Sequence, residues 1–475
     1  MPACLASVAV FFLLAGSAQA VEFGFNEAWG HNELSPETDA RLSQMEADAG
    51  GEVHRLVVQW DDVEHQEGVF DWRYYDRVID NVEAAGMRPL IVIMNAPRWA
   101  QTPFECQGEI CPPAPNRLDD WARFAYEVTL RYPQAAAIEV WNEPNGRGQW
   151  VTAAGPDPER FASVFNSAAG AIHFANPTMP VIVGSVTYWL EDDRYHMTIP
   201  KFVERFYRAG GGAQLRPEID GIGLHAYPWI TELTTLDGPF STILSQMRGE
   251  LARFDPTRKI WMTETGVTTS GRYAVTRREQ ALGILTLATV VPTMPDIAAL
   301  TIHSSIEAPA DRNSPDDPGY GLVSRQELEP SLAYCALAEL HGTSTSTTGC
   351  RSGILDDLGW ENGGPDCEDG GGTDTDGDGD CDCVDAGGID ADGDGDCDCE
   401  DQGGTDTDGD GDCDCVDAGG IDVDGDGKCD RDLRREARKH CRAKHSAAPW
   451  WPFATRKERR HKMQNCTRRY IRRHS

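Results

Sequence analysis

Between Val21 and about residue 345, short apolar segments rich in β-branched residues alternate with segments of helical periodicity. Nearly continuous apolar strands are typical of parallel sheets whose faces are covered by helices. We expect strands over residues 21–26, 54–60, 88–95, 136–142, 180–186, 219–227, 259–265 and 297–303. Eight strand–helix units in about 325 residues predict an α/β fold, the (β/α)8 TIM barrel.

The alternative for such an alternating pattern is a doubly wound open sheet. That fold commonly carries a glycine-rich phosphate loop directly after its first strand. No such loop follows residues 21–26 here, so the pattern favours the barrel.

The first 20 residues hold an apolar run that ends in Ala18-Gln19-Ala20. This is the small-x-small pattern that precedes signal-peptide cleavage, although no Lys or Arg precedes the run. The alternative is a short membrane anchor, but the run is shorter than the roughly 20 residues that a span needs. We therefore expect a secreted or cell-surface protein with no membrane span after cleavage.

The cysteine count agrees with export to an oxidising compartment. The chain has 15 Cys, and removal of Cys4 with the signal peptide leaves an even number. Two local pairs are disulfide candidates, Cys106 with Cys111 and Cys335 with Cys350, and the other ten cysteines lie at or beyond Cys367.

Charge divides the chain further. The net charge of −34 includes 25 acidic and no basic residues over 366–426, whereas residues 427–475 hold 17 Lys or Arg and 4 acidic residues. We expect a signal peptide at 1–20, a catalytic barrel at 21–345, a Thr/Ser/Gly-rich linker at 346–366, acidic repeats at 367–433 and a basic tail at 434–475.

Two glutamates fall at the carboxyl ends of predicted strands. Glu143 ends the fourth strand, just before Pro144, and Glu264 lies near the end of the seventh. In barrels that rim carries the active site, and a pair of carboxyl groups facing one sugar is what glycosidic cleavage requires. A single Glu at a strand end is more often a solvated rim charge, so the pairing is what matters.

Asn142-Glu143-Pro144 on the fourth strand together with Glu264 on the seventh resembles clan A of the glycoside hydrolases. The segment over residues 60–100 strongly resembles the second and third βα units of that clan. Families 39 and 5 look most similar, with family 39 slightly favoured. The resemblance covers the barrel and implies a retaining enzyme, with Glu143 as acid/base, Glu264 as nucleophile and the two carboxyl groups about 5–5.5 Å apart.

The resemblance also implies roles for four more residues. Asn142 is similar to the residue that hydrogen-bonds the sugar 2-hydroxyl, and Arg55 to the arginine that keeps the nucleophile ionised. His225 and Tyr227 resemble the pair on the sixth strand, where the tyrosine hydroxyl bonds the nucleophile. Arg55 could instead be a structural ion-pair residue, and His225 a packed structural one.

The eighth strand departs from the clan pattern. Many members carry a Trp at its end, under the sugar, whereas this strand ends in His303 followed by two serines. His303 could take that position, or Trp99 or Trp189 could supply the platform. Trp150 and Trp229 also fall on predicted rim loops, but Trp is often simply core.

The acidic segment repeats with a period of sixteen residues. Asp stands at positions 1, 3, 5 and 9 of each loop and at position 12 of the first three, and Gly stands at position 6, which is the oxygen-ligand spacing of a calcium loop. The fourth repeat has Leu433 at position 12. The predicted structural Ca²⁺ ligands are Asp374, Asp376, Asp378, Asp382, Asp385, Asp390, Asp392, Asp394, Asp398, Asp401, Asp406, Asp408, Asp410, Asp414, Asp417, Asp422, Asp424 and Asp426.

The repeats resemble thrombospondin type 3 repeats more than true EF-hands, because Cys-Asp-Cys recurs within them. A disordered acidic spacer is the alternative, and zinc is disfavoured by the density of carboxylates. The basic tail would suit an anionic cell-surface or matrix polymer. Its charge would permit nucleic acid, which we do not expect outside a cell, and it could also fold back on the acidic repeats.

The sequence therefore predicts a secreted retaining glycoside hydrolase that acts on a polysaccharide or oligosaccharide and needs no cofactor for catalysis. The alternative from another class is a non-catalytic carbohydrate-binding adhesin on a calcium-stabilised stalk. Two glutamates together with Asn142 and Tyr227 favour the enzyme, because a binding module has no use for a paired acid and nucleophile.

Overall fold

The computed structural model divides the chain into two compact units, Met1–Leu358 and Gly359–Ser475. It describes residues 21–26, 34–103, 105–106, 110–152, 154–210, 219–228, 236, 239–309, 317–343, 348–361 and 364–365. The predicted signal peptide, calcium repeats and basic tail lie outside the described residues. In the second unit, β9 (Trp360–Glu361) pairs antiparallel with β10 (Gly364–Pro365).

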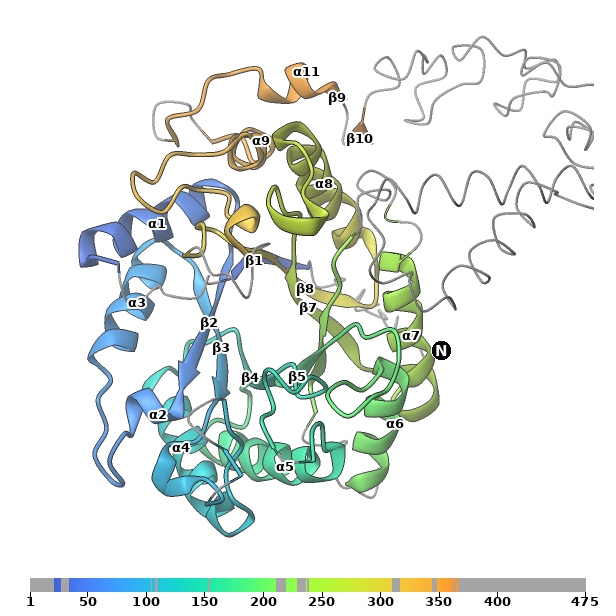
Figure 1. Cartoon of the computed structure of the whole chain (residues 1–475). Coiled ribbons are helices and arrows are strands. Elements are labelled where there is room, and N and C mark those ends of the chain that lie inside the picture. Colours follow the sequence, from blue (N-terminus) through green and yellow to red (C-terminus); the bar gives the residue numbers. More distant parts are fainter. Residues whose placement is uncertain are drawn as a thin grey trace, which may run out of the picture. The chain divides into compact units, whose positions relative to one another are not determined.

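Eight parallel strands of the first unit close into a barrel in the order β1 to β8, with β8 paired to β1. This confirms the predicted (β/α)8 barrel, and each strand lies within two residues of its expected bounds (Figure 1). The strands are β1 (Glu22–Asn26), β2 (Val53–Gln59), β3 (Arg88–Met94), β4 (Ala137–Asn142), β5 (Val181–Thr187), β6 (Gly221–His225), β7 (Lys259–Thr265) and β8 (Ile297–His303).

Helices surround the barrel and connect its strands. The α-helices are α1 (Pro36–Asp48), α2 (Trp60–Val63), α3 (Arg73–Ala84), α4 (Leu118–Arg131), α5 (Pro158–Ala175), α6 (Ile199–Ala209), α7 (Pro239–Phe254), α8 (Arg277–Val290), α9 (Leu332–Leu340) and α11 (Ile354–Leu358). Short 3₁₀ turns are η2 (Arg98–Ala100), η3 (Pro115–Arg117), η5 (Gly271–Tyr273), η6 (Val291–Thr293) and η7 (Asp317–Tyr320).

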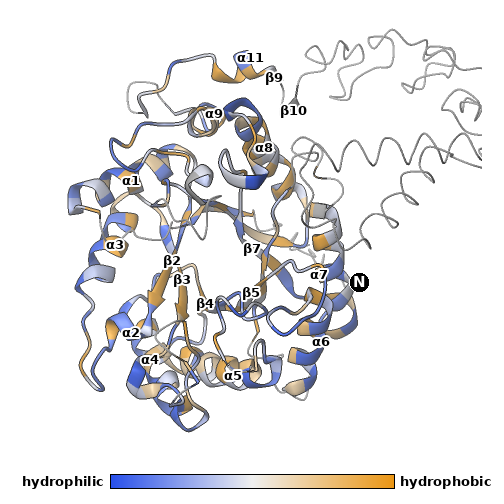
Figure 2. Cartoon of the chain, viewed as in Figure 1, coloured by the Kyte–Doolittle hydropathy of each residue, from blue (hydrophilic) through white to orange (hydrophobic). Residues whose placement is uncertain are grey.

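Local sequence signals explain where several helices begin. The Ser35 hydroxyl accepts a hydrogen bond from the Thr38 backbone N–H at the start of α1, and Pro36 occupies the first helical position. At α8, Thr276 and Glu279 form a reciprocal capping box. Figure 2 shows mostly hydrophobic residues along the strands and both hydrophobic and hydrophilic residues on the surrounding helices, as expected for a sheet covered by amphipathic helices.

The barrel wall leaves little free space between strands. A Cβ atom at Gly184 on β5 would lie 2.4 Å from the Val140 carbonyl oxygen on β4. Outside the barrel, the aromatic rings of Trp60, Trp121 and Phe124 pack together, with ring centroids 5.5–5.7 Å apart. These contacts pack α2 against α4.

The first unit continues past the barrel to Leu358, whereas the sequence placed residues 346–366 in a linker. The disulfide between Cys335 and Cys350 joins this segment to α9, and the other expected disulfide, Cys106–Cys111, is also present. The Glu339 carboxylate accepts hydrogen bonds from the backbone N–H groups of Gly353, Ile354 and Leu355. The disulfide and the hydrogen bonds from the Glu339 carboxylate thus hold a segment whose Thr/Ser/Gly-rich composition predicts a flexible linker.

Within the described part of the chain, no helix combines the length and the apolar character that a membrane crossing requires.

We predict that the double variant Cys335→Ala/Cys350→Ala is less stable than the wild type by about 3 kcal/mol, because a disulfide that closes a loop of this length restricts the unfolded chain. Guanidinium unfolding followed by tryptophan fluorescence measures the difference. The control is the same comparison in a reductant, where the two proteins should become equal. An unchanged midpoint without reductant would contradict the prediction.

Candidate active site

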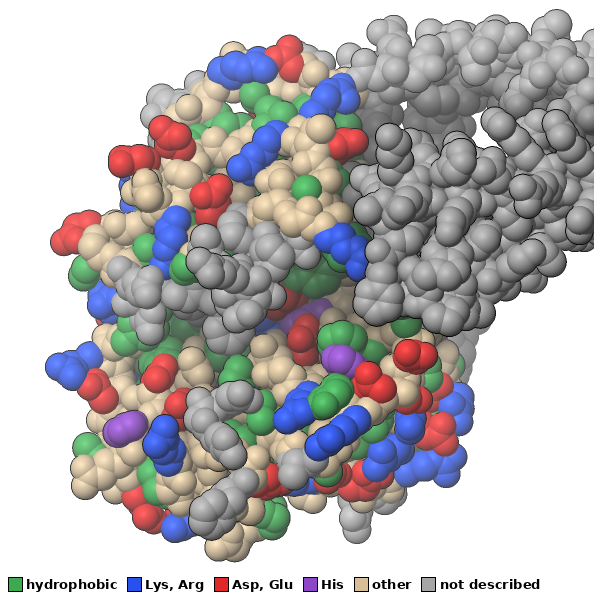
Figure 3. Space-filling view, viewed as in Figure 1, with side chains coloured by type: hydrophobic (Ala, Val, Ile, Leu, Met, Phe, Trp, Pro, Cys, Tyr) green, Lys and Arg blue, Asp and Glu red, His purple; other side chains and the backbone are tan. Residues whose placement is uncertain are grey.

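Glu143 and Glu264 lie together at the carboxyl-terminal rim of the barrel, one directly after β4 and the other on β7. Their side chains are 22 % and 18 % exposed. One oxygen of each carboxylate and a ring nitrogen of His225 all lie within 4.8 Å of one another. Figure 3 shows acidic and histidine side chains in the hollow at the centre of this face.

The backbone is unusual where β4 delivers Glu143. Trp141 and Glu143 both have positive φ, 82° and 42°, a region that costs a non-glycine residue free energy and persists where surrounding contacts enforce it. The Trp141 indole is buried and its N–H donates to the Gln149 carbonyl at 2.6 Å. The Asn145 amide binds the backbone of Thr187 on β5, at 2.7 and 3.1 Å. These bonds fix the turn that carries Glu143.

Glu264 accepts hydrogen bonds from three side chains. The Tyr227 hydroxyl donates to Oε1 at 2.5 Å, the Asn26 amide donates to Oε2 at 2.8 Å, and the Arg55 guanidinium lies 3.4 Å from Oε2. Each of these contacts favours the ionised carboxylate.

The balance of charges holds Glu264 ionised. Burial alone would raise the pKa of Glu264, but the cationic forms of His225 and His303, the Arg55 guanidinium and the Tyr227 hydroxyl bring this pKa down to about 2. The pKa of Tyr227 is raised well above its ordinary value by burial and by the charge of Glu264. Tyr227 therefore remains a hydrogen-bond donor.

Arg55 is enclosed in the barrel and is 1 % exposed. Its Nε donates to Glu139 at 2.8 Å, its Nη2 to the Asn142 side-chain oxygen at 2.8 Å, and its Nη1 to the Asn26 side-chain oxygen at 3.1 Å. Burial would lower the pKa of Arg55, but Glu139 and Glu264 raise it above its ordinary value.

Glu139 and Asn26 were not among the residues expected from the sequence. Glu139 is fully buried and also accepts hydrogen bonds from the Ser185 backbone at 2.9 Å and from the Thr263 hydroxyl at 3.2 Å. The available signal was a charged residue inside an otherwise apolar strand. For Asn26, it was a polar residue at the end of β1.

His225 joins the two glutamates. Its side chain is fully buried, and its Nδ1 lies 2.9 Å from Glu143 Oε1 and 3.8 Å from Glu264 Oε2. His225, Glu143 and Glu264 are also a group of described residues close enough together to hold a metal ion.

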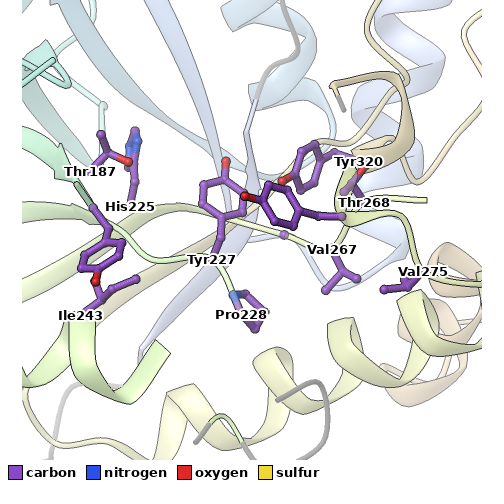
Figure 4. Close-up of a pocket in the computed structure, with 12 residues that line it drawn as sticks. Thr187, His225, Tyr227, Pro228, Ile243, Val267, Thr268, Val275 and Tyr320 are labelled. Carbon is purple, nitrogen blue, oxygen red and sulfur yellow. The ribbon is translucent and has the colours of Figure 1, made fainter. Parts of the chain in front are cut away.

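His303 on β8 lies beside the same carboxylate. Its Nδ1 is 3.3 Å from the Asn26 amide nitrogen that binds Glu264. Its ring centroid is 5.3 Å from that of Tyr320 and 6.5 Å from that of Tyr227. Tyr320 and Tyr227 border a cavity of about 220 Å³ that reaches His225 (Figure 4).

The tryptophans considered as platforms have other surroundings. Trp150 is fully buried and belongs to the core. The Trp99 indole N–H donates to the Glu64 carbonyl at 3.0 Å, and its ring packs edge-on against Trp60. Trp189 lies on the His196 ring, with centroids 3.8 Å apart. Trp229 lies outside the described residues.

A second polar group lies at the ends of β2 and β3. The Asn95 amide donates to Gln59 at 3.0 Å and to Asp61 at 2.9 Å, and its oxygen accepts from the Cys111 backbone at 3.1 Å. Burial and the neighbouring Asp62 raise the pKa of Asp61 to about 7. None of these three polar residues was predicted from the sequence.

The model of the family "Cellulase (glycosyl hydrolase family 5)" matches residues 14–286, more than half of the chain and a span that includes both Glu143 and Glu264. A comparison with curated proteins found no match.

Solved structures share the barrel at low identity. A glucosidase from Croceicoccus marinus is 14 % identical with a TM-score of 0.52, over 69 % of this chain and 68 % of that one. A GH5_18 enzyme from Bifidobacterium longum subsp. infantis is 11 % identical with a TM-score of 0.50, over 68 % and 79 %. A family 39 glycoside hydrolase from Bacteroides cellulosilyticus WH2 is 18 % identical with a TM-score of 0.49, and the chain spans 64 % of its length.

At these identities the structures show the fold alone. The family match corrects the slight preference for family 39, because residues 14–286 fit family 5. Asn142-Glu143-Pro144 and Glu264 resemble motifs of the whole clan, so they do not distinguish family 39 from family 5. The chain belongs to glycosyl hydrolase family 5 and is a clan A O-glycosyl hydrolase that acts on carbohydrates with retention of configuration.

Proposed function

We propose that the protein is a secreted enzyme that hydrolyses O-glycosidic bonds of a polysaccharide or oligosaccharide, with Glu264 as nucleophile and Glu143 as acid/base. The observation that carries these roles is the difference between the two carboxyl groups. Glu264 receives hydrogen bonds from Tyr227 and Asn26, whereas Glu143 is paired with the His225 ring. Two adjacent carboxyl groups in unlike environments are suited to opposite protonation states.

In the first step, a carboxylate oxygen of Glu264 bonds to the anomeric carbon while the glycosidic C–O bond breaks. Glu143 transfers its proton to the departing oxygen. In the second step, Glu143 removes a proton from water, the water oxygen bonds to the anomeric carbon, and Glu264 is released as a carboxylate. Each step inverts the anomeric centre, so that the sum retains configuration.

Asn142 and Arg55 prepare the site for the sugar. The Asn142 side-chain oxygen accepts from Arg55 at 2.8 Å, and this bond leaves the Asn142 amide nitrogen as the group that donates to the sugar 2-hydroxyl. Such a bond accelerates the reaction when it tightens in the oxocarbenium-like transition state. Trp99 and His303 remain proposed substrate contacts on the same rim.

Three segments outside the described residues have roles around the catalytic barrel. Residues 1–20 direct export, residues 367–433 bind structural Ca²⁺, and the basic residues of the tail at 434–475 attract an anionic surface or matrix polymer. Catalysis itself requires no cofactor in this mechanism.

We predict that Glu264→Ala abolishes sugar release, because the alanine side chain has no carboxylate to form the glycosyl–enzyme bond. The test is a panel of aryl glycosides and polysaccharides that includes cellulose, assayed with calcium by product chromatography. Glu67→Ala, which alters an exposed carboxylate, is the matched control and should keep wild-type rates. Equal release by wild type and Glu264→Ala would refute the assignment of the nucleophile.

We predict that Tyr227→Phe shifts the acid limb of kcat/KM to higher pH. The hydroxyl stabilises the charged form of Glu264, so its loss raises the pKa of Glu264 from about 2, and activity that needs the carboxylate fails earlier as pH falls. The rate near neutral pH should also fall about tenfold, the value of one hydrogen bond to a charged group. Tyr126→Phe serves as the control, and an acid limb that stays in place would count against the role of Tyr227.

We predict that the full chain binds at least three Ca²⁺ ions, because three of its repeats carry the complete set of aspartates. Equilibrium dialysis with ⁴⁵Ca measures the number. Asp374→Ala/Asp378→Ala should remove about one ion, whereas Glu67→Ala should remove none. Binding of no calcium would favour the acidic spacer.

A further inference from the structure

The turn that carries Glu143 rests on the segment of residues 149–151, which follows it in the chain. The Trp141 indole N–H donates to the Gln149 carbonyl at 2.6 Å, and the Trp141 ring packs against the buried Trp150 ring with centroids 5.1 Å apart. Trp141 and Glu143 both have positive φ. Backbone of this kind persists where neighbouring contacts enforce it. The position of the Glu143 carboxyl group therefore depends on where residues 149–151 lie.

A loop closed by a disulfide lies against this segment. Cys106 and Cys111 are bonded to each other, and Cys111 is fully buried. The Val151 backbone N–H donates to the Ile110 carbonyl at 3.0 Å, and the Val151 carbonyl oxygen contacts the Cys106 sulfur. Both contacts are made at a disulfide cysteine or directly beside one, so the disulfide holds the surface on which Val151 lies.

The same loop is fixed to the barrel at the end of β3. The Cys111 backbone N–H donates to the Asn95 side-chain oxygen at 3.1 Å, and the Cys111 carbonyl accepts from the Ala96 N–H at 2.8 Å. Asn95 is 6 % exposed and has a positive φ of 60°. The loop thus connects the end of β3 to residues 149–151, which follow β4.

Arg160 on α5 links the loop to this segment a second time. Its Nη1 donates to both oxygens of Glu105 at 2.8 and 3.0 Å, and its Nη2 donates to the Pro113 carbonyl at 3.0 Å. Its Cζ atom lies 6.0 Å from the centre of the Trp150 ring. The side chains of Arg160 and Glu105 are 16 % and 21 % exposed, and an ion pair of this kind is held more firmly than one on the open surface.

We propose that the Cys106–Cys111 loop is a positioning element for the acid/base Glu143, acting through residues 149–151 and Trp141. The inference rests on the proposed function. A general acid must lie within hydrogen-bond reach of the oxygen that it protonates. A misplacement of about 1 Å, even from a change far from the reacting atoms, costs up to about 100-fold in rate.

The nucleophile is held by other parts of the barrel. Glu264 receives its hydrogen bonds from Tyr227, which follows β6, and from Asn26 on β1. Loss of the loop should therefore impair proton transfer by Glu143 and spare attack by Glu264. A glycoside whose leaving group needs a proton should lose rate, whereas one whose leaving group departs as a stable anion should not.

The test compares phenyl and dinitrophenyl glycosides of the sugar that the aryl-glycoside panel identifies. In the full chain, Cys106→Ala/Cys111→Ala should lower kcat/KM about tenfold for the phenyl glycoside and less than about twofold for the dinitrophenyl glycoside. The matched control is Cys335→Ala/Cys350→Ala, which removes the other disulfide and should treat the two substrates alike. A loop that only stabilises the fold would lower the melting temperature and leave the ratio of the two kcat/KM values at its wild-type value.

Glu143→Ala separates this inference from the proposed function. This variant should show the same dependence on the leaving group in a larger form, and if it does not, the assignment of Glu143 in the proposed function fails. If Glu143→Ala shows the dependence but Cys106→Ala/Cys111→Ala keeps the wild-type ratio, the inference about the loop is overturned. Should the cysteine variant not fold, Arg160→Met, which removes the ion pair with Glu105, is assayed in its place and decided by the same ratio.

Discussion

The active site depends on one buried cation, the Arg55 guanidinium, inside the barrel. It binds side chains from two other strands, Asn26 on β1 and Glu139 and Asn142 on β4, and it lies 3.4 Å from Glu264 on a third, β7. A charge taken out of water costs several kcal/mol unless it is paired and hydrogen-bonded. The partners of Arg55 meet this requirement and are thereby fixed in position themselves.

The same network sets the electrostatics of the reaction. Glu139 forms the closest ion pair with Arg55, at 2.8 Å, whereas Glu264 lies 3.4 Å from the guanidinium. Arg55 therefore lowers the pKa of Glu264 without forming a close ion pair with it. His225 and His303 add positive potential around Glu264, and the pKa of Glu264 falls to about 2 despite burial. A nucleophile that stays ionised but lies at long distances from the cations can attack the anomeric carbon without first breaking a close ion pair.

Barrel closure makes this arrangement possible. The groups around Glu264 come from β1, β2, β6, β7 and β8, which are far apart in the chain but adjacent once β8 pairs with β1. The register places Asn26 beside His303 and His225 beside Glu264. Segments after the strands add further side chains. Tyr320 follows β8 by a turn that α8 and the loop after β7 hold in place.

The sequence by itself determined the strand pattern, the barrel and the two glutamates at strand ends. Apolar periodicity and strand termini are local properties, and Asn142, Arg55, His225 and Tyr227 were identified through motifs on those strands.

Trp150 fell on a predicted rim loop but is buried, because composition cannot tell which side of a loop faces the core. Glu139 and Asn26 were missed because their significance lies in contacts across the barrel. The segment up to Leu358 also needed the tertiary structure, since Cys350 and the Glu339 cap anchor residues that look like a linker. Local sequence fixes which residues end each strand, whereas the closed barrel decides which of those ends meet, because contact between distant strands depends on register and closure.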